Sequence, residues 1–310
     1  MRPLLVRYSL IVLIGLLTVP IPLLLCGIAT PAEPLAIRDD LNRSIQFVKA
    51  PTRVVSLAPS ITEMLFALGL DRDIIAVTQF CDYPPQALLK QKVGYSNPSI
   101  EAIVALNPDL IIAPREFLRA DLLGKVEQLQ IPLVVLSANS VTDITTHLTK
   151  LGAIFGRAAQ ADAAITHVQQ RIDSIHRVTA GRPGVRVLYV LNSHPLITVG
   201  PGNFIHELIG LAGGINIAGN TATPYPRLNM EVVLREDPDV LVFPVGKVES
   251  VPLSEQHVWQ QWPALSAVKH GQLRHVPSDL LNRPGPRIGD GLEALARAIH
   301  PEAFTGISAR

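Results

Sequence analysis

The sequence predicts an α/β protein with two similar lobes, mostly parallel sheets, one long helix joining the lobes, and a ligand cleft between them. Three observations predict this fold. Short apolar runs alternate with helical segments, which is typical of parallel sheets. A helix–turn–strand stretch occurs twice, at residues 99–114 and 229–244. A long amphipathic stretch at residues 158–179 separates the two copies, so each copy is expected to belong to its own Rossmann-like lobe.

The two copies begin with the same helix signals. Ser99 and Asn229 are good N-cap residues, because their side-chain oxygens accept a hydrogen bond from a first-turn N–H. Glu101 and Glu231 follow in the first turn, where the helix dipole favours a carboxylate. A glutamate at the same place in each lobe therefore requires an explanation.

The two copies also end alike. Pro108 and Pro238 end the helices, since proline disfavours helical geometry in the residue before it. Each is followed by an apolar run that suits a strand covered on both faces. We expect each strand to stop at the next proline, Pro114 or Pro244.

Taken from the start, residues 1–32 predict a signal peptide. Arg2 and Arg7 form a positive region ahead of an apolar run at residues 8–28, and small residues then offer a cleavage site. The alternative is a retained membrane anchor, because the run is long enough to span a bilayer. With either a signal peptide or an anchor, the rest of the chain is exported, and we expect it in the periplasm.

Residues 33–140 are expected to form the N-terminal lobe. It begins with a short hairpin of residues 35–37 against 45–48. Glu63 is explained as the capping-box partner of Ser60,. The predicted strands are 54–57, 74–77, 110–113 and 133–136, and the predicted helices are 60–68, 99–106 and 119–129.

Residues 141–181 are expected to form a helical connector. One helix covers residues 141–155, and a second covers 158–179 with an apolar stripe that includes Val168 and Ile172,. About 20 residues at 1.5 Å each reach roughly 30 Å, enough to bridge two lobes. Nothing rich in Ser and Gly separates the halves, so we expect a rigid connection.

Residues 182–310 are expected to form the C-terminal lobe. Its predicted strands are 187–191, 240–243 and 273–276, and its final helix is 289–299.

Composition and motifs argue against several classes of function. The net charge of +1 gives no support for nucleic-acid binding,. Cys81 is the one cysteine left after removal of the leader, so no intramolecular disulfide is expected. His206 and Glu207 begin a zinc-protease pattern, but Gly210 stands where the second histidine is needed,. We expect no catalytic residues, no metal site and no cofactor.

Aromatic residues in loops predict the ligand site. Phe80 and Tyr83 belong to a stiff loop that ends in two prolines, and Tyr95 and Tyr225 each stand six residues before a repeated glutamate. Loops at strand ends are where open α/β sheets bind ligands. These residues predict an aromatic-walled cleft for a large flat or apolar ligand.

Two arginines complete the predicted ligand contacts. Arg283 belongs to a stiff loop of prolines and glycine, and Arg115 follows Pro114 in the first lobe. Their guanidinium groups either meet anionic edges of the ligand or are solvated.

Four segments carry a resemblance to a known family. Residues 53–63, 81–85, 101–109 and 286–287 resemble class III periplasmic substrate-binding proteins, which serve ABC importers of cobalamin, haem and ferric siderophores. The chain is most similar to the cobalamin-binding branch, and the resemblance covers residues 50–302. It implies two α/β lobes joined by one long helix, with the ligand between the lobes.

The resemblance also implies roles for single residues. Glu101 and Glu231 would dock onto arginines of the membrane permease. Phe80, Tyr95 and Tyr225 match aromatic ligand contacts of the cobalamin branch, although Tyr95 replaces a family tryptophan. A second family tryptophan position falls near Pro114.

The function implied by this resemblance is that of a monomeric periplasmic protein that captures cobalamin and delivers it to an ABC importer permease. A haem- or siderophore-binding protein of the same class is the alternative. A haem binder needs an axial ligand, which Tyr83, Tyr95 or His194 would supply. The remaining alternative functions are an enzyme on this scaffold and a membrane-anchored sensor.

Overall fold

A computed structural model describes residues 34–94, 98–247, 251–252 and 256–305. The predicted signal peptide and Tyr95 lie outside the described residues. Both lobes belong to one unit of mutually contacting residues that begins at Pro34.

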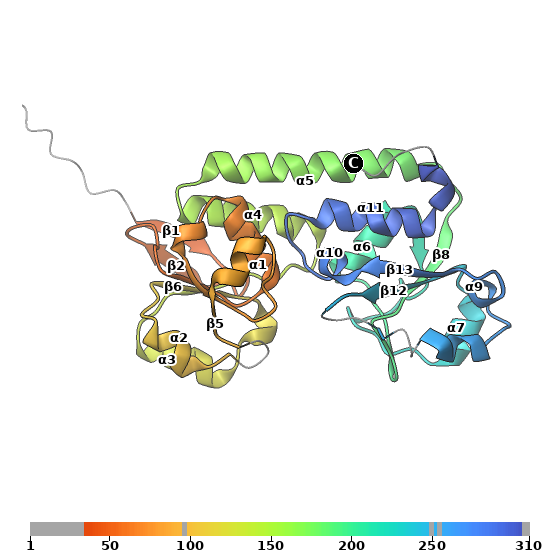
Figure 1. Ribbon diagram of the computed structural model, residues 1–310, viewed down its shortest axis with the longest axis horizontal. Coiled ribbons are helices and arrows are strands. Elements are labelled where there is room, and N and C mark those ends of the chain that lie inside the picture. The colour runs from red at the N-terminus through yellow and green to blue at the C-terminus, as the bar shows by residue number, and fades with distance from the viewer. Residues whose placement is uncertain (1–33, 95–97, 248–250, 253–255, 306–310) are drawn as a thin grey trace, which may run out of the picture. The chain divides into compact units, whose positions relative to one another are not determined.

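The N-terminal lobe is built on a parallel sheet with the strand order β5-β4-β3-β6-β7 (Figure 1). The chain runs outward from β3 through β4 to β5, then returns to add β6 beside β3 and β7 beyond it. The strands are β3 (Val54–Ser56), β4 (Ile74–Val77), β5 (Gln91–Lys92), β6 (Leu110–Ala113) and β7 (Leu133–Val135). The helices are α1 (Pro59–Ala67), α2 (Ile100–Ala105), α3 (Ala120–Gln128) and the 3-10 turns η1 (Asp71–Asp73), η2 (Pro85–Leu89) and η3 (Arg115–Phe117).

The predicted N-terminal hairpin is confirmed. Strands β1 (Leu35–Arg38) and β2 (Ser44–Phe47) pair antiparallel. Ile37 and Phe47 are buried in the core, so the hairpin packs as part of the first lobe.

The C-terminal lobe repeats this plan with a second parallel sheet, in the order β11-β8-β12-β13. A small antiparallel hairpin of β9 (Asn192–Ser193) and β10 (Leu196–Ile197) follows β8. The strands of the sheet are β8 (Val185–Tyr189), β11 (Gly214–Asn216), β12 (Val240–Val245) and β13 (Leu273–Pro277). The helices are α6 (Phe204–Leu211), α7 (Met230–Glu236), η4 (His257–Gln261), α9 (Ser266–Lys269), α10 (Ser278–Leu281), α11 (Ile288–Ile299) and η5 (Pro301–Phe304).

The repeated stretch has the same local structure in both lobes. Ser99 accepts a hydrogen bond from Ala102 N at 3.1 Å, and Asn229 accepts one from Val232 N at 2.9 Å. Both predicted N-caps are therefore confirmed, and each adds about 1 kcal/mol to helix stability.

The turn after each helix is held by an equivalent aspartate. Asp109 accepts a hydrogen bond from Arg53 N at 2.8 Å, and Asp239 accepts one from Arg186 N at 2.8 Å. Each aspartate thus ties the turn to the residue at or just before the start of the neighbouring strand, β3 or β8.

One prediction about the repeat is wrong. Strand β12 does not stop at Pro244 but continues to Val245, with Pro244 opposite Val276 of β13. Proline is tolerated there because β8 pairs with β12 only as far as Val242, so the missing N–H of Pro244 faces no partner strand.

The long connector is confirmed as α4 (Val141–Ile154) followed by α5 (Ala158–Thr179). Helix α5 packs on α4 and on α11 of the C-terminal lobe (Figure 1). Its stripe is buried as predicted, with Val168 fully enclosed and Ile172 nearly so.

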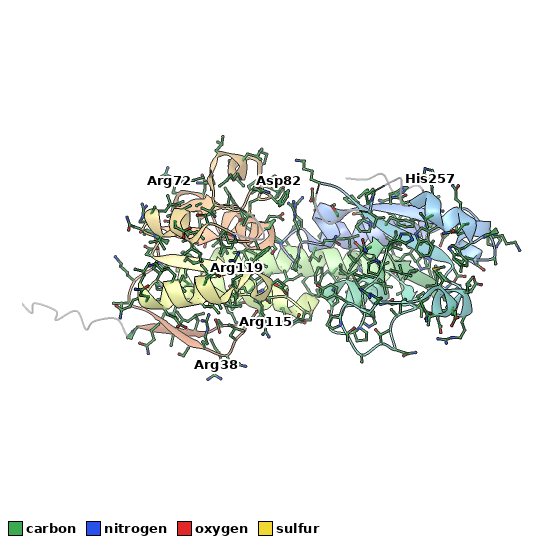
Figure 2. All side chains as sticks on the ribbon, turned by 90° about the horizontal axis from the view of Figure 1, so that it is seen from below. Arg38, Arg72, Asp82, Arg115, Arg119 and His257 are labelled. Carbon is green, nitrogen blue, oxygen red and sulfur yellow. The ribbon has the colours of Figure 1, made fainter. Side chains whose placement is uncertain are left out.

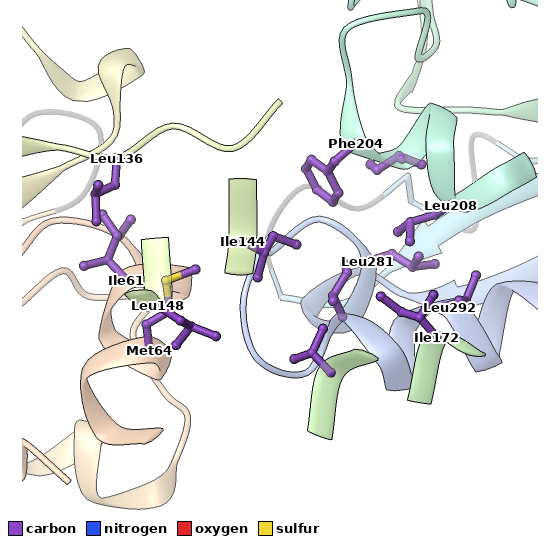
Figure 3. Packing of buried hydrophobic residues seen from close by; sticks show 14 of the residues in the cluster. Ile61, Met64, Leu136, Ile144, Leu148, Ile172, Phe204, Leu208, Leu281 and Leu292 are labelled. Carbon is purple, nitrogen blue, oxygen red and sulfur yellow. The ribbon is translucent and has the colours of Figure 1, made fainter. Parts of the chain in front are cut away.

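The two lobes share one hydrophobic core. A single buried cluster extends from Ile61 and Met64 of α1, through Ile144 of α4, to Leu281 and Leu292 of the C-terminal lobe (Figure 3). Because this core crosses from one lobe to the other, rotating the lobes apart would expose apolar surface to water.

Candidate functional site

A cleft of about 200 Å³ lies between the lobes and is lined by both. In the first lobe its walls follow the carboxyl ends of β3, β6 and β7, and in the second lobe the carboxyl end of β13. Parallel strands direct their carboxyl ends to one edge of a sheet, and open α/β sheets bind ligands there. The lining includes Pro114, Glu116 and Phe117 from the first lobe, His147 from α4, and Phe204, Tyr225, Ser278, Asp279, Asn282 and Arg283 from the second lobe.

Aromatic rings from both lobes line this cleft. Phe117 ends the 3-10 turn after β6, and Phe204 is the buried first residue of α6. Tyr225 is 61% exposed at the rim of the second lobe. Rings on facing walls suit a broad, flat or apolar ligand.

The loop that carries Tyr225 is fixed by its backbone. Gly200 N donates to Pro224 O at 2.9 Å, and Thr198 N donates to Pro226 O at 3.1 Å. A Cβ on Gly200 would collide with Thr223 O, so only glycine allows this close approach.

Polar side chains line the wall of the C-terminal lobe at α10. Asn282 Oδ1 accepts a hydrogen bond from Tyr189 Oη at 2.8 Å. Ser278 is 1% exposed, and its Oγ has no hydrogen-bond partner among the described residues. A buried hydroxyl without a partner is uncommon, and here it stands in the wall of the candidate site.

His147 lies at the base of the cleft and is fixed by Asp40. Its Nε2 lies 2.7 Å from Asp40 Oδ2, while Lys150 Nζ lies 2.7 Å from Asp40 Oδ1. Ser137 N donates to the same carboxylate at 2.7 Å. Burial alone would raise the pKa of Asp40, but hydrogen bonds from His147 and Lys150 outweigh it and hold that pKa well below its usual range,.

A cluster of charged side chains joins the lobes beside the cleft. Arg283 is 8% exposed, and its guanidinium lies 2.8 Å from Asp82, 2.8 Å from Asp279 and 3.4 Å from Glu63. Asp82 also pairs with Lys247 at 3.2 Å. Arg283, Asp279 and Lys247 come from the second lobe, and Glu63 and Asp82 from the first.

The predicted role of Glu63 is wrong. Helix α1 begins at Pro59 and has no side-chain cap, so Ser60 lies inside the helix and Glu63 has no capping box to complete. Glu63 instead receives hydrogen bonds from Arg287 at 2.6 and 2.8 Å. Burial raises the pKa of Glu63 above its ordinary value despite the two nearby arginines.

The predicted ligand contacts divide into two groups. Tyr225 and Arg283 line the cleft. Tyr83 lies in a neighbouring hollow with Glu63, where the Arg287 guanidinium stacks 3.8 Å from the centre of its ring.

Two further predicted contacts do not line the cleft. Phe80 accepts a hydrogen bond at its carbonyl from Arg283 at 3.3 Å. Arg115 is exposed, and its guanidinium donates to Asp40 O at 2.9 Å (Figure 2). Tyr95 lies outside the described residues. The assignment of these side chains, and of Tyr83, to a ligand stays a prediction.

Several lining residues were not predicted from the sequence. Glu116 and Phe117 follow β6 directly, and Asp279 follows β13, so the rule that sites lie at carboxyl strand ends could have found them. His147 and Phe204 lie within helices, and no sequence signal separates them from ordinary core residues.

The two repeated glutamates lie away from the cleft. Glu101 and Glu231 are exposed in the first turns of α2 and α7. Ser99 Oγ lies 3.2 Å from a carboxylate oxygen of Glu101. Their role in docking stays a prediction.

In the described part of the chain, no group of three His, Cys, Asp or Glu side chains is arranged to hold a metal ion. No helix in the same residues has the length and apolar character needed to cross a membrane.

The known proteins to which this chain is similar are periplasmic binding proteins. The family described as periplasmic binding protein matches residues 54–280. The chain is 33% identical over 249 residues to a vitamin B12-binding protein of Vibrio cholerae, covering 78% of this chain and 86% of that one. The crystal structure of the periplasmic vitamin B12 binding protein BtuF of Vibrio cholerae is similar with a TM-score of 0.71 at 31% identity, covering 82% and 98% of the two chains. A periplasmic heme binding protein from Pseudomonas aeruginosa is similar with a TM-score of 0.68 at 26% identity, covering 81% and 93%.

Proposed function

This chain belongs to the periplasmic binding protein family, in its class III, vitamin B12-binding branch, and we propose that it captures a corrinoid and delivers it to the permease of an ABC importer. The protein acts by binding and release rather than by catalysis. We propose that it works as a monomer, and the supply of both walls of the cleft by one chain supports this.

The cleft between the lobes is the observation that carries this proposal. Aromatic rings of Phe117 and Tyr225 lie on opposite lobes, and polar groups of Ser278 and Asn282 line the wall of the C-terminal lobe at α10. A corrinoid has an apolar macrocycle and a rim of amides. Rings bind the apolar part, and a few well-placed polar groups orient the rim.

The size of the cleft favours a ligand that lies across its mouth. A volume of about 200 Å³ is below the several hundred Å³ typical of pockets that enclose a drug-sized molecule. A corrinoid is larger still, so it would seat one side in the cleft. The exposed ring of Tyr225 at the rim would contact the part that remains outside.

Delivery to the permease is assigned to the two exposed glutamates. Glu101 and Glu231 occupy equivalent positions in the repeat, one on each lobe. A single exposed ion pair contributes little free energy. Two pairs formed together fix the register and orientation of the docked protein.

Haem is the second candidate ligand. The similarity to the Pseudomonas aeruginosa heme binding protein is the observation that favours it. Tyr83, Tyr95 or His194 would have to supply the axial ligand. Tyr83 already stacks with Arg287 and lies outside the cleft lining, which favours the corrinoid over haem.

Calorimetric titration of the protein from Pro34 onward tests the proposal. We expect one-to-one binding of cyanocobalamin and weaker binding of hemin and of a ferric siderophore. Tyr225→Ala should weaken cobalamin binding roughly 3- to 10-fold, because it removes a stacking ring. Leu89→Ala, which truncates an 87% exposed side chain outside the cleft, is the control. Binding of hemin but not cobalamin would overturn the corrinoid assignment.

A further inference from the structure

We infer that this cleft selects a macrocycle with a neutral amide rim over one with a carboxylate rim, and that Glu116 sets this preference. The inference rests on the proposed function and concerns which ligands of that class are accepted. Two features of the described residues carry it: the arginine and the histidine on the wall already have carboxylate partners, and one carboxylate on the wall has none.

The side chains of the cleft wall that could pair with an anion already have carboxylate partners. Arg283 is buried against the carboxylates of Asp82 and Asp279, each 2.8 Å from its guanidinium, with Glu63 at 3.4 Å. His147 has Asp40 2.7 Å from its Nε2. An incoming carboxylate would have to displace a partner from one of these groups, at a cost that a buried pair makes large.

The undescribed internal segments contain no basic side chain. Residues 95–97, 248–250 and 253–255 contain neither lysine, arginine nor histidine. Arg115 is the next residue to Glu116, but its guanidinium is bonded to Asp40 O, and it borders a different hollow.

Glu116 is the carboxylate without a partner. It is exposed on η3, directly after β6, and it lines the cleft. Within the described residues it forms no hydrogen bond or ion pair. Asp279 also lines the cleft, from the other lobe, but its carboxylate lies 2.8 Å from the guanidinium of Arg283.

The charges on the cleft wall therefore favour a ligand whose rim carries uncharged hydrogen-bond donors. Glu116 contributes a negative charge that no described side chain offsets, whereas the positive charge of Arg283 is offset by its partners Asp82 and Asp279. Like charges brought together in a partly desolvated cleft repel, whereas an amide N–H donates to a carboxylate. A dicarboxylate such as haem is disfavoured on the same ground.

Cyanocobalamin and its monocarboxylate, in which one propionamide is hydrolysed to propionate, give a direct test. The two ligands differ by one charge and otherwise share their shape. By calorimetry at low salt, we expect the protein to bind the amide form roughly 3- to 10-fold more tightly, which corresponds to one screened charge contact. The ratio of the two affinities should decrease as the salt concentration is raised.

Glu116→Gln should bring the two affinities together, because it removes the negative charge that repels the propionate and weakens the acceptor that the amide N–H meets. Glu127→Gln is the matched control, because it removes an equal charge from an exposed position on α3 outside the cleft lining. Equal binding of both ligands by the unmodified protein would overturn the inference. An unchanged ratio in Glu116→Gln, or the same loss in Glu127→Gln, would overturn the role of Glu116.

Failure of the proposed function has a different outcome. If no corrinoid binds, the corrinoid assignment fails, and hemin and its dimethyl ester provide the same comparison of carboxylate with neutral rim. A preference for the free acid of hemin would then overturn the charge selection as well.

Discussion

Arg287 and Glu63 form a bidentate ion pair between the lobes. Arg287 Nη2 lies 2.6 Å from Glu63 Oε1, and Arg287 Nε lies 2.8 Å from Glu63 Oε2. The Glu63 side chain is 3% exposed and that of Arg287 is 20% exposed. The planar guanidinium matches the carboxylate in this geometry. Together with the shared core, this pair holds the two lobes at one relative orientation.

Glu63→Gln should destabilise the folded protein. It removes the carboxylate partner of Arg287 and weakens the support of Arg283, leaving buried positive charge. We expect the free energy of unfolding to fall by about 3 kcal/mol, measured by urea denaturation at neutral pH. Glu236→Gln, which breaks an exposed pair with Arg235, should change it by no more than about 1 kcal/mol. Equal effects would refute the structural role of the buried pair.

Because of Asp40, the free energy of unfolding should decrease at acidic pH. Its pKa is lowered in the folded state, so its contribution is present above the unfolded pKa of about 3.9 and is lost as pH falls towards the folded value. Asp40→Asn should therefore be less stable than the unmodified protein at neutral pH. The difference in unfolding free energy should shrink below about pH 4. A difference that stays constant down to the acid limit of folding would contradict this assignment.

Gly200→Ala should disturb the loop that carries Tyr225. The new methyl group would collide with Thr223 O, so the loop must move, and both stability and ligand affinity should decrease. Gly210→Ala is the control, because its Cβ meets no atom within 4 Å and the position lies inside α6. That change should stabilise the protein by about 0.5–1 kcal/mol. Thermal unfolding together with titration of cyanocobalamin measures both effects.

Glu101→Ala and Glu231→Ala should separate binding from transport. Both side chains are exposed outside the cleft lining, so ligand affinity should stay within about twofold of the unmodified protein, as is usual for surface changes. Uptake in cells that express the cognate importer should fall for each variant and fall furthest for the pair. Loss of ligand binding in either variant would remove the docking assignment.

Ligand binding should move the lobes little. The core that extends from Met64 to Leu292 is continuous through α4 and α5, so opening would cost apolar burial at about 25 cal/mol per Å². Small-angle scattering curves with and without ligand should therefore almost coincide. A clear decrease in the radius of gyration on binding would contradict the rigid connection.

Local signals in the sequence determined most of the fold. The caps at Ser99 and Asn229, the buried stripe of α5 and the apolar strands depend on residues a few positions apart, so their physics can be read along the chain. The same signals placed Tyr225 and Arg283 at the cleft. The family motifs are short and contiguous, so the sequence alone was enough to identify the class of protein.

Only the tertiary structure decided which side chains meet. Glu63 and Arg287 are 224 positions apart. The local explanation of Glu63, a capping box with Ser60, fails because α1 begins at Pro59. Glu116 and Phe204 line the cleft because separate lobes bring them to one edge. The packing of distant segments determines such contacts, so they cannot be predicted from the spacing or the type of residues in the sequence.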